Sequence, residues 1–381
     1  MSTRSARLSR VLALAVVGLL AVACSSTSNS SAAGDSGSAK TTVGFIMVGS
    51  TSDYGYNQAV YTAGQQLAKD IPNVNVITAD HVPENNSVTQ TMQSMVNKGA
   101  KVIFASSYGY YAYAEKFAAA HPDVIVLHQG GFETGKFSPN FGTYWGQAYE
   151  PVSLGGMAAG GLTKTNKLGF VYAFPISQTI ANIDAFELGA RSVNPQAQTY
   201  LVNTSNWCDP LKQKEAAAAL LSEGVDVLSQ HQDCQTTVIQ TAKAAGKYVV
   251  GYHYDAKSLD PSGWLTGSAW NWTPVYEAIT KVALSGNFTG SKYNANWVGS
   301  FADHDNPLTL ASFGSSVPPD LQSKITAAQT ALKNPGASVF TGPITCQDGS
   351  TLVAAGQTMT YDQINNISCL VKGVVGTLPK S

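Results

Sequence analysis

"TTVGFIMVGSTSDYGYNQAVYTAGQQLAKD", residues 41–70, contains one complete unit of the predicted fold. Its first eight residues form an apolar run with several β-branched side chains, which predicts a buried strand. Residues 57–70 place Val60, Ala63 and Leu67 on one face of a predicted helix. A strand that is apolar throughout, followed by an amphipathic helix, is the repeating unit of α/β folds with parallel sheets.

The same alternation recurs along the chain in two series. The first series adds predicted strands at 101–106 and 123–128 and a helix at 111–120. A long predicted helix at 149–163 separates it from the second series. The second series comprises strand 167–172, helix 179–192, strand 198–203, helix 211–223, strand 225–229, helix 235–245 and strand 247–251. Two such series predict two α/β lobes, each with a parallel sheet covered on both faces.

The predicted domain organisation follows from this alternation. Residues 41–147 are expected to form an N-terminal lobe, with a returning segment at about 270–297. Residues 148–269 are expected to form a C-terminal lobe, with a contribution from about 298–381. The last part of the chain lacks clean alternation, so we expect it to cross between the lobes and to add edge strands.

The N-terminus has the pattern of an export signal (1–23). Arg4, Arg7 and Arg10 precede the apolar run at 11–23, and Cys24 follows small residues. This order predicts a lipoprotein that is cleaved before Cys24 and acylated on it. The alternative is plain secretion with a chance cysteine, because Ala21 stands where lipoprotein signals usually carry leucine.

The segment after that cysteine predicts how the protein is held. Residues 24–40 are rich in Ser and Gly, which is typical of a flexible tether. Two or three acyl chains anchor a protein stably, because each buried methylene contributes roughly 0.8 kcal/mol. The sequence therefore predicts a protein attached to the outer face of the cytoplasmic membrane.

Composition excludes several classes of protein. Of the 381 residues, 44% are hydrophobic and 12% are charged, which leaves enough apolar material for two cores. The net charge is −1 and no run of Lys or Arg occurs, so no nucleic-acid partner is expected. After the signal, no stretch reaches the roughly 18–20 apolar residues that a membrane-spanning helix needs. We expect a monomer.

Four further cysteines, Cys208, Cys234, Cys346 and Cys369, are expected in an oxidising compartment if the chain is exported. Four cysteines allow three pairings. Proximity in sequence favours 208 with 234 and 346 with 369. A zinc site is the competing interpretation, but no C-x-x-C or H-x₃-H spacing supports it.

Aromatic and polar residues follow the predicted strands. In open parallel sheets, ligands bind outside the carboxyl ends of the strands, so these residues are the candidate site. The aromatic residues are Tyr54, Tyr56, Tyr108, Tyr110, Tyr111, Trp207, Tyr252, Tyr254, Trp270 and Trp272, and the polar ones are Asp53, Asn57, Asp209, Asp233 and Asp255. Lys257 is the exception to a near absence of Lys and Arg in these loops. Rings beside carboxylates suit a flat heterocycle with N–H donors, or a sugar ring, and do not suit a phosphate.

The order of these segments resembles the basic membrane protein family, also called the purine nucleoside receptor family, of lipoproteins that bind substrates for ABC importers. The resemblance extends from about residue 42 to 378. The matching segments are "VGFIMVGSTSDYGYNQAVYTAGQQL", "VPENNSVTQTMQSMVNKGAKVIFASSYGY", "KTNKLGFVYAFPISQTIANIDAFELGARSVNP", "WCDPLKQKEAAAALLSEGVDVLSQHQDC", "LTGSAWNWTPVY" and "VFTGPITCQDGS". The resemblance implies a type I periplasmic-binding-protein fold, two Rossmann-like lobes with the ligand in the cleft between them.

The resemblance also implies a ligand class and site residues. Family ligands are mostly purine bases or nucleosides, handed to ABC permease subunits. Asp53, Tyr56 and Asn57 stand in the family's ligand-binding motif, and Asp255 stands at its ribose-binding aspartate. Trp270 stands where the nucleoside receptors usually have a lysine. The chain is more similar to the branch with W-x-D-P and Trp-rich cleft loops, some members of which bind free purines such as adenine.

The stretch "SNWCDP" (205–210) combines several of these expectations. We expect Trp207 to face the cleft as a stacking platform, together with Tyr56, Tyr108 and Trp270, while Asn57, Asp233 and Asp255 supply hydrogen bonds. Asp209 is expected to cap the helix at 211–223, with Pro210 at its first position. In the alternative interpretation, Trp207 packs in a hydrophobic core, and a disulfide between Cys208 and Cys234 only stabilises the fold.

Two other functions stay open at this point. His231 with Asp233, and His253 with Asp255, could ligate a metal or act as acid and base, which would suit a metal-dependent enzyme. No G-x-S-x-G, H-E-x-x-H or P-loop motif supports an enzyme, and no metal or other cofactor is expected. A receptor that reports its ligand to a membrane signalling partner would use the same cleft and the same lobe closure.

Overall fold

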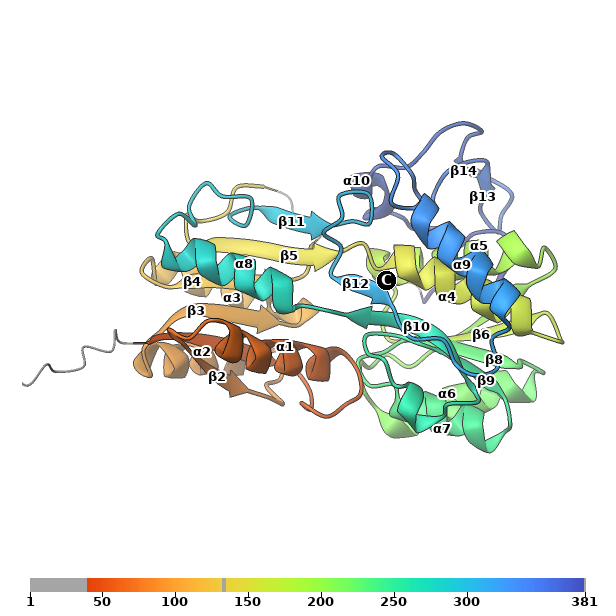
Figure 1. The fold of residues 1–381 in the computed structure, drawn as a ribbon, viewed down its shortest axis with the longest axis horizontal. Coiled ribbons are helices and arrows are strands. Elements are labelled where there is room, and N and C mark those ends of the chain that lie inside the picture. Colours follow the sequence, from red (N-terminus) through yellow and green to blue (C-terminus); the bar gives the residue numbers. More distant parts are fainter. Residues whose placement is uncertain (1–39, 132–134, 380–381) are drawn as a thin grey trace, which may run out of the picture. The chain divides into compact units, whose positions relative to one another are not determined.

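The computed structural model describes residues 40–131 and 135–379 (Figure 1). The predicted signal peptide and the lipidation site at Cys24 lie outside the described residues, as does the predicted tether except for Lys40. Residues 39–381 form one compact unit. Within the described ranges, no helix has both the length and the apolar character needed to cross a membrane.

The first lobe contains a six-stranded sheet in the order β11-β5-β4-β3-β1-β2, and all of its neighbouring strands are parallel. Its strands are β1 (Thr41–Met47), β2 (Val74–Ala79), β3 (Ala100–Ser106), β4 (Ile125–Gln129), β5 (Phe141–Gly146) and β11 (Asn296–Gly299). Successive residues of β1 face opposite cores: Phe45 packs in one and Ile46 in the other. Both residues are fully buried, as expected for a parallel sheet covered on both faces.

Helices cover both faces of this sheet. They are α1 (Tyr56–Asp70), α2 (Ser87–Asn97), the short 3-10 helix η1 (Tyr108–Tyr110), α3 (Tyr111–Ala120) and α8 (Thr273–Leu284). Helices α1 and α8 pack on the face of Phe45, and α2 and α3 pack on the face of Ile46. The α1 residues buried on this face include Val60, Ala63 and Leu67, the apolar stripe that the sequence predicts.

The second lobe contains a seven-stranded sheet in the order β12-β10-β9-β8-β6-β7-β15. Its strands are β6 (Lys167–Tyr172), β7 (Gln198–Asn203), β8 (Val227–His231), β9 (Tyr248–Gly251), β10 (Trp264–Trp270), β12 (Leu308–Leu310) and β15 (Val374–Val375). Only the β10–β12 pair is antiparallel. The β6 residues Phe170 and Val171 are buried in different cores on the two faces.

The remaining helices and short elements belong with this second sheet or follow it in the chain. They are α4 (Tyr149–Leu162), α5 (Ser177–Val193), α6 (Pro210–Ser222), α7 (Thr236–Ala244), η2 (Lys257–Leu259), α9 (Pro319–Ala331), β13 (Ile344–Thr345), β14 (Thr351–Val353) and α10 (Tyr361–Ile364). Helices α4, α5 and α9 cover the face of Phe170, and α6 and α7 cover the face of Val171. Strands β13 and β14 form a separate two-stranded sheet.

The C-terminal part of the chain contributes strands to both sheets. Strand β11 is an edge of the first sheet, whereas β12 and β15 are the two edges of the second. The disulfides Cys208–Cys234 and Cys346–Cys369 are both present, which is the pairing that proximity in sequence favours. The second of them closes the segment that contains β14 and α10.

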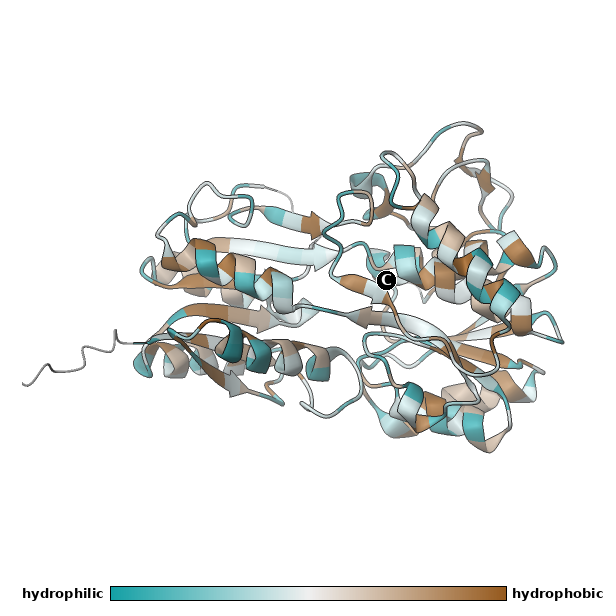
Figure 2. Ribbon diagram, in the orientation of Figure 1, coloured by the Kyte–Doolittle hydropathy of each residue, from teal (hydrophilic) through white to brown (hydrophobic). Residues whose placement is uncertain are grey.

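Most predicted elements agree with the structure to within two residues, but β5 was not predicted. Its sequence, FGTYWG, has two glycines and a threonine among its six residues. Figure 2 shows β5 pale, whereas β3, which lies beyond β4 in the same sheet, is strongly hydrophobic. All six β5 residues are nevertheless buried, because the strand lies between β4 and β11 and is covered by the helices of the lobe.

Candidate functional site

Both sheets share one strand order, and that order determines where the candidate site lies. In the first lobe β2-β1-β3-β4-β5 is the doubly wound order, and β7-β6-β8-β9-β10 repeats it in the second lobe. The order reverses between β1 and β3, and again between β6 and β8. A crevice forms outside the carboxyl ends of the strands at such a reversal, because the connections leave in opposite directions.

A cavity lies at these strand ends, and the space between its lining atoms, open solvent included, is about 370 Å³. The first lobe contributes residues that follow or end β1, β3, β4 and β5: Tyr56, Ser107, Tyr108, Gln129 and Trp145. The second lobe contributes residues that follow or end β6, β7, β8 and β9: Ile176, Gln178, Trp207, His231, Asp233 and His253. The cavity therefore lies between the lobes and is built from the ends of eight strands.

Trp207 is surrounded by other rings. Its ring centroid lies 4.9 Å from that of Phe174 and 6.4 Å from that of Tyr108, both at steep interplanar angles. The His231 ring lies 6.2 Å away at 34°. Tyr108 is 43% exposed, unlike the buried lining rings of Tyr56 and Trp145. Edge-to-face neighbours hold the indole in one orientation, which leaves its face available for stacking.

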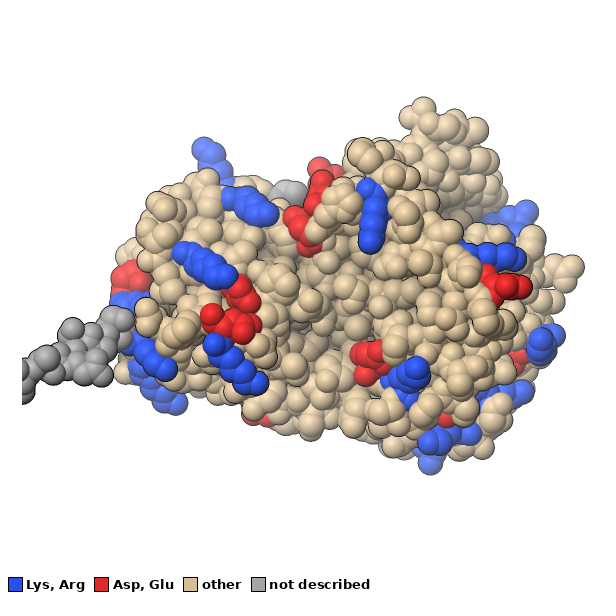
Figure 3. All heavy atoms as spheres, in the orientation of Figure 1, with Lys and Arg blue, Asp and Glu red and all other residues tan. Residues whose placement is uncertain are grey.

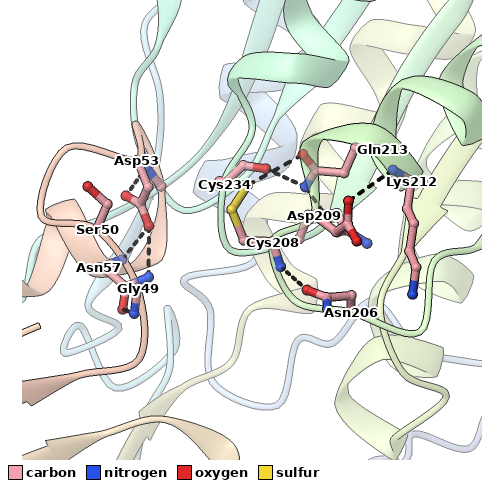
Figure 4. Close-up of a disulfide and its surroundings, with 12 residues drawn as sticks. Gly49, Ser50, Asp53, Asn57, Asn206, Cys208, Asp209, Lys212, Gln213 and Cys234 are labelled. Carbon is pink, nitrogen blue, oxygen red and sulfur yellow. Dashed lines mark hydrogen bonds between the residues drawn. A yellow bond between two sulfur atoms is a disulfide. The ribbon is translucent and has the colours of Figure 1, made fainter. Parts of the chain in front are cut away.

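The loop that carries Trp207 is fixed at several points (Figure 4). The Asp233 backbone N–H donates to the Trp207 carbonyl oxygen at 2.8 Å, and the Cys208–Cys234 disulfide joins the next residue on each side. Asp209 caps α6 by accepting from the backbone N–H groups of Leu211 and Lys212, with proline at the first helical position. The helix cap predicted from the sequence is thereby confirmed.

Asp233 contributes an acidic side chain to the cavity lining. Its side chain is 7% exposed, and no side chain or backbone N–H of the described residues donates to its carboxylate. Burial raises the pKa of Asp233 well above its ordinary value, and the neighbouring carboxylates of Asp53 and Glu84 raise it further. A donor group on a ligand would stabilise this acceptor, because an unpaired buried polar group is costly.

Two histidines lie on the same wall. Asn182 Nδ2 lies 3.1 Å from Nδ1 of His231, and Trp270 Nε1 donates to Nδ1 of His253 at 2.7 Å. Burial lowers the pKa of His231 to about 3 and that of His253 well below its ordinary value, so both rings are neutral at pH 7. Within the described ranges, Nε2 of His253 is buried and has no hydrogen-bond partner.

Two glutamines complete the polar lining. Gln129 accepts from the Tyr144 hydroxyl at 3.2 Å, and its buried Nε2 has no partner among residues 40–131 and 135–379. Gln178 donates to the carbonyl oxygen of Gly130 in the first lobe at 2.7 Å. The part of the cavity lining that the structure describes therefore presents several neutral donors and one acidic acceptor, and it includes no Lys or Arg.

The lobes touch directly beside the cavity. The Tyr56 backbone N–H donates to the Asp233 carbonyl oxygen at 2.9 Å, and Gln235 Nε2 donates to the Tyr54 carbonyl oxygen at 2.5 Å. A Cβ atom on Gly55 would lie 1.7 Å from the Asp233 carbonyl oxygen. Only a glycine permits this approach, so the structure is a closed arrangement of the lobes that depends on Gly55.

The structure places Tyr56, Tyr108, Trp207 and Asp233 on the cavity, and it places the other four predicted ligand contacts elsewhere. Asp53 accepts from the backbone N–H groups of Gly55, Asn57 and Gln58, and Figure 4 shows it turned toward Asn57. Asn57 is itself held by Asp53 and by the backbone N–H of Gly49. These polar atoms organise the loop after β1, so they are not directed at the cavity.

Asp255 and Trp270 also lie behind the lining. Asp255 accepts from the backbone N–H and hydroxyl of Ser312, 3.0 and 2.6 Å away. Trp270 stacks on Trp272 at 4.2 Å, and it contacts two lining residues, through its hydrogen bond to His253 and through the Trp145 ring 4.8 Å away. Its place in the structure is that of a support for lining residues.

Sequence reasoning missed Gln129, Trp145, Ile176 and Gln178, and it considered His231 and His253 only as metal ligands or as acid and base. The strand-end rule could have found Gln129, which ends β4, and Gln178, which follows β6. Trp145 lies in β5, which was not predicted, so no sequence signal indicated its position.

Metal chemistry has no support in the described residues. His231 and His253 direct their Nδ1 atoms at donor groups, and the described ranges contain no group of three His, Cys, Asp or Glu side chains that could hold a metal ion. On the face in Figure 3, basic and acidic side chains lie interspersed, without a large patch of one sign.

Comparisons with known proteins agree with this geometry. A family model described as "ABC transporter substrate-binding protein PnrA-like", of the Bmp family, matches residues 40–298. A purine-binding protein of Brucella abortus is 29% identical over 90% of this chain and 95% of its own length. A putative ABC transporter glucose-binding protein of Haloferax volcanii is 32% identical over 73% of this chain and 66% of its own length. A solved ABC transporter solute-binding protein from Conexibacter woesei matches 77% of this chain and 96% of its own with a TM-score of 0.62 at 20% identity, which shows the shared fold.

Proposed function

The chain belongs to the Bmp family of PnrA-like ABC transporter substrate-binding proteins, and from this premise we propose that it captures a purine base or nucleoside between its lobes. Members of the family are extracytoplasmic binding proteins and not enzymes, with a small-molecule ligand and permease subunits as partners. The fold, with two doubly wound lobes around a cavity, is that of a type I periplasmic-binding protein.

The arrangement of Trp207 and Asp233 carries the purine proposal. The indole provides a flat apolar face, and the carboxylate on the neighbouring loop is an acceptor with no donor from the described residues. A purine offers a π-face for stacking and N–H groups for the carboxylate in one rigid molecule. The similarity to the purine-binding protein of Brucella abortus supports the same ligand class.

Glucose is the second candidate, because the Haloferax volcanii relative is a putative glucose-binding protein. A sugar would also stack on an indole and donate to a carboxylate. Purines fit better because, among the described residues, Tyr56, Tyr108, Trp145 and Trp207 give the cavity four aromatic side chains and Asp233 is its only acidic side chain.

Calorimetric titration of the purified protein tests the proposal. We expect adenine, guanine, hypoxanthine or one of their nucleosides to bind with a Kd in the micromolar range or below, while glucose binds at least a hundredfold more weakly. Strong glucose binding without purine binding would reassign the ligand class. Unchanged ligand on recovery, checked by chromatography, is expected of a binding protein.

We further propose that Cys24 carries the lipid anchor and that the protein works as a monomer on the outer face of the cytoplasmic membrane. The order of basic, apolar and small residues before Cys24 supports the anchor. Cys24→Ala should release the protein from the membrane fraction, and sedimentation of that released form should give the mass of one chain. Membrane retention of Cys24→Ala would argue for another mode of attachment.

A further inference from the structure

His231 and His253 form a pair on the cavity wall that the proposed function leaves without a role. Their ring centroids lie 6.0 Å apart, and the two rings are nearly perpendicular. The residues are 4% and 1% exposed, yet both line the cavity. A neutral imidazole carries its proton on one of two nitrogens, and the partner of the other nitrogen decides which.

The tautomer of His253 follows from Trp270. The indole N–H can only donate, so Nδ1 of His253 must accept and the ring proton must be on Nε2. That Nε2 atom is buried and has no hydrogen-bond partner among the described residues. A buried donor without a partner is costly, so a ligand acceptor placed there would be strongly favoured.

The tautomer of His231 follows in the same way from Asn182. The Asn182 amide nitrogen lies 3.1 Å from Nδ1 of His231 and donates to the Tyr252 hydroxyl at 2.9 Å, which uses both of its hydrogens. An amide nitrogen can only donate, so Nδ1 of His231 accepts and its proton is also on Nε2. Burial lowers the pKa of both rings, which keeps them neutral.

We propose that His231 and His253 determine ligand specificity as two fixed, neutral N–H donors, each set by its neighbour Asn182 or Trp270. The inference rests on the proposed function and specifies its ligand: a planar heterocycle with two acceptor atoms, ring nitrogens or carbonyl oxygens, for the histidines. The same ligand also presents an N–H group to Asp233. A free purine base has both features on one rigid ring system.

Nitrogen NMR of the histidine rings at pH 7 tests the tautomers without any ligand. Both rings should show a protonated Nε2 and an unprotonated Nδ1. A protonated Nδ1 on either ring, as a rotated Asn182 amide would produce at His231, overturns the proposal. Trp270→Phe removes the indole donor and should let the His253 ring change tautomer, while the His231 signals stay unchanged.

Titration with single-atom analogues tests the ligand side. Adenine is compared with 1-deazaadenine, 3-deazaadenine and 7-deazaadenine, each of which replaces one acceptor nitrogen by C–H. At least two of the three analogues should bind about tenfold or more weakly, since each loss leaves one histidine N–H without its acceptor on the ligand. Equal binding of all three analogues and adenine overturns the proposal.

Paired variants assign each donor to its acceptor. His253→Phe removes the donor, whereas His253→Gln keeps an amide N–H near the position of Nε2. Both replacements are made at the same backbone position, whose φ is 74°, so the backbone affects both variants alike. We expect adenine binding to weaken about tenfold or more in His253→Phe and to recover partly in His253→Gln, with equal thermal stability of the two variants. In His253→Phe, one deazaadenine should no longer be penalised relative to adenine.

The outcomes separate this inference from the proposed function. If no purine binds the wild type, both fail. If purines bind but the analogues, or the Phe and Gln variants, do not differ, only the role of the histidines fails. Should a His253 variant lose thermal stability, the corresponding His231→Phe and His231→Gln pair carries the same comparison.

Discussion

The Asp233 backbone N–H donates to the Trp207 carbonyl oxygen across 2.8 Å, and the residues that follow them, Cys234 and Cys208, are joined by a disulfide. A hydrogen bond and a covalent bond on consecutive residues fix the two loops that carry the proposed stacking ring and the proposed acceptor. Preorganised groups lose less conformational freedom when a ligand binds, so this link contributes to affinity as well as to stability.

Removing this disulfide should therefore affect both properties. Cys208→Ser with Cys234→Ser is expected to lower the free energy of unfolding by about 3–4 kcal/mol, for a sequence separation of 26 residues. Purine affinity should also fall, by about tenfold, in calorimetry. Cys346→Ser with Cys369→Ser is the matched control, because its separation is 23 residues and neither cysteine lines the cavity. Equal losses of affinity in both double variants would contradict a local role for the first disulfide.

Trp207→Ala should weaken purine binding at least tenfold, because it removes the stacking face and leaves Phe174 and Tyr108 without their ring partner. The melting temperature of the ligand-free protein should change by only a few degrees. Trp297→Ala, a buried tryptophan in β11 that does not line the cavity, is the control for general loss of packing. An unchanged purine affinity in Trp207→Ala would assign that residue to packing alone.

Gly55→Ala should prevent the lobes from closing. Its Cβ atom would lie 1.7 Å from the Asp233 carbonyl oxygen, and the Tyr56–Asp233 backbone hydrogen bond beside it would be lost. We expect ligand affinity to fall by a hundredfold or more while the folded lobes survive, which small-angle scattering would record as a more open protein. Ser52→Ala, an exposed position of the same loop, should behave as wild type. Wild-type affinity in Gly55→Ala would show that this contact is not needed for binding.

Two buried acids in α5 predict a dependence of stability on pH. Burial raises the pKa of Glu187 to about 7 and that of Asp184 well above its ordinary value. The folded state then binds more protons than the unfolded state between pH 4.5 and 7. The contribution of Glu187 to stability is therefore complete below pH 4.5 and is lost as the pH rises through 7.

The variant Glu187→Gln isolates this contribution from that of the buried neutral histidines, which act in the opposite direction. The free energy of unfolding of Glu187→Gln minus that of wild type should rise by about 3 kcal/mol from pH 4 to pH 8 in denaturant titrations. The exposed Glu215→Gln on α6 is the control and should show a flat difference. A flat difference for Glu187→Gln as well would mean that its carboxyl group is not perturbed by burial.

Much of the fold could be predicted because the parallel strands are buried on both faces and are apolar throughout. Strand β5 escaped prediction because burial between neighbouring strands and helices, not its own composition, makes it a strand. Residues of the last hundred positions become edge strands of both sheets, and short edge strands carry little periodicity to detect.

The candidate site was predictable at the level of strand ends but not of individual contacts. Trp207 and Asp233 follow strands and line the cavity, whereas Asp53 follows a strand and binds its own loop, and Asp255 follows a strand and binds Ser312. The same residue types do both, because Asp and Asn accept from backbone N–H groups in turns as readily as from ligands. Only the three-dimensional path of each loop decides between these two roles.

Trp145 and Trp207, two of the chain's six tryptophans, line the cavity. A further tryptophan, Trp270, is hydrogen-bonded to His253, which also lines it. Indole fluorescence responds to the water and to the rings around it, so occupancy of this site will alter the light that the protein emits. An unlabelled, colourless solute could thus be followed optically, in real time, with no dye attached to either molecule.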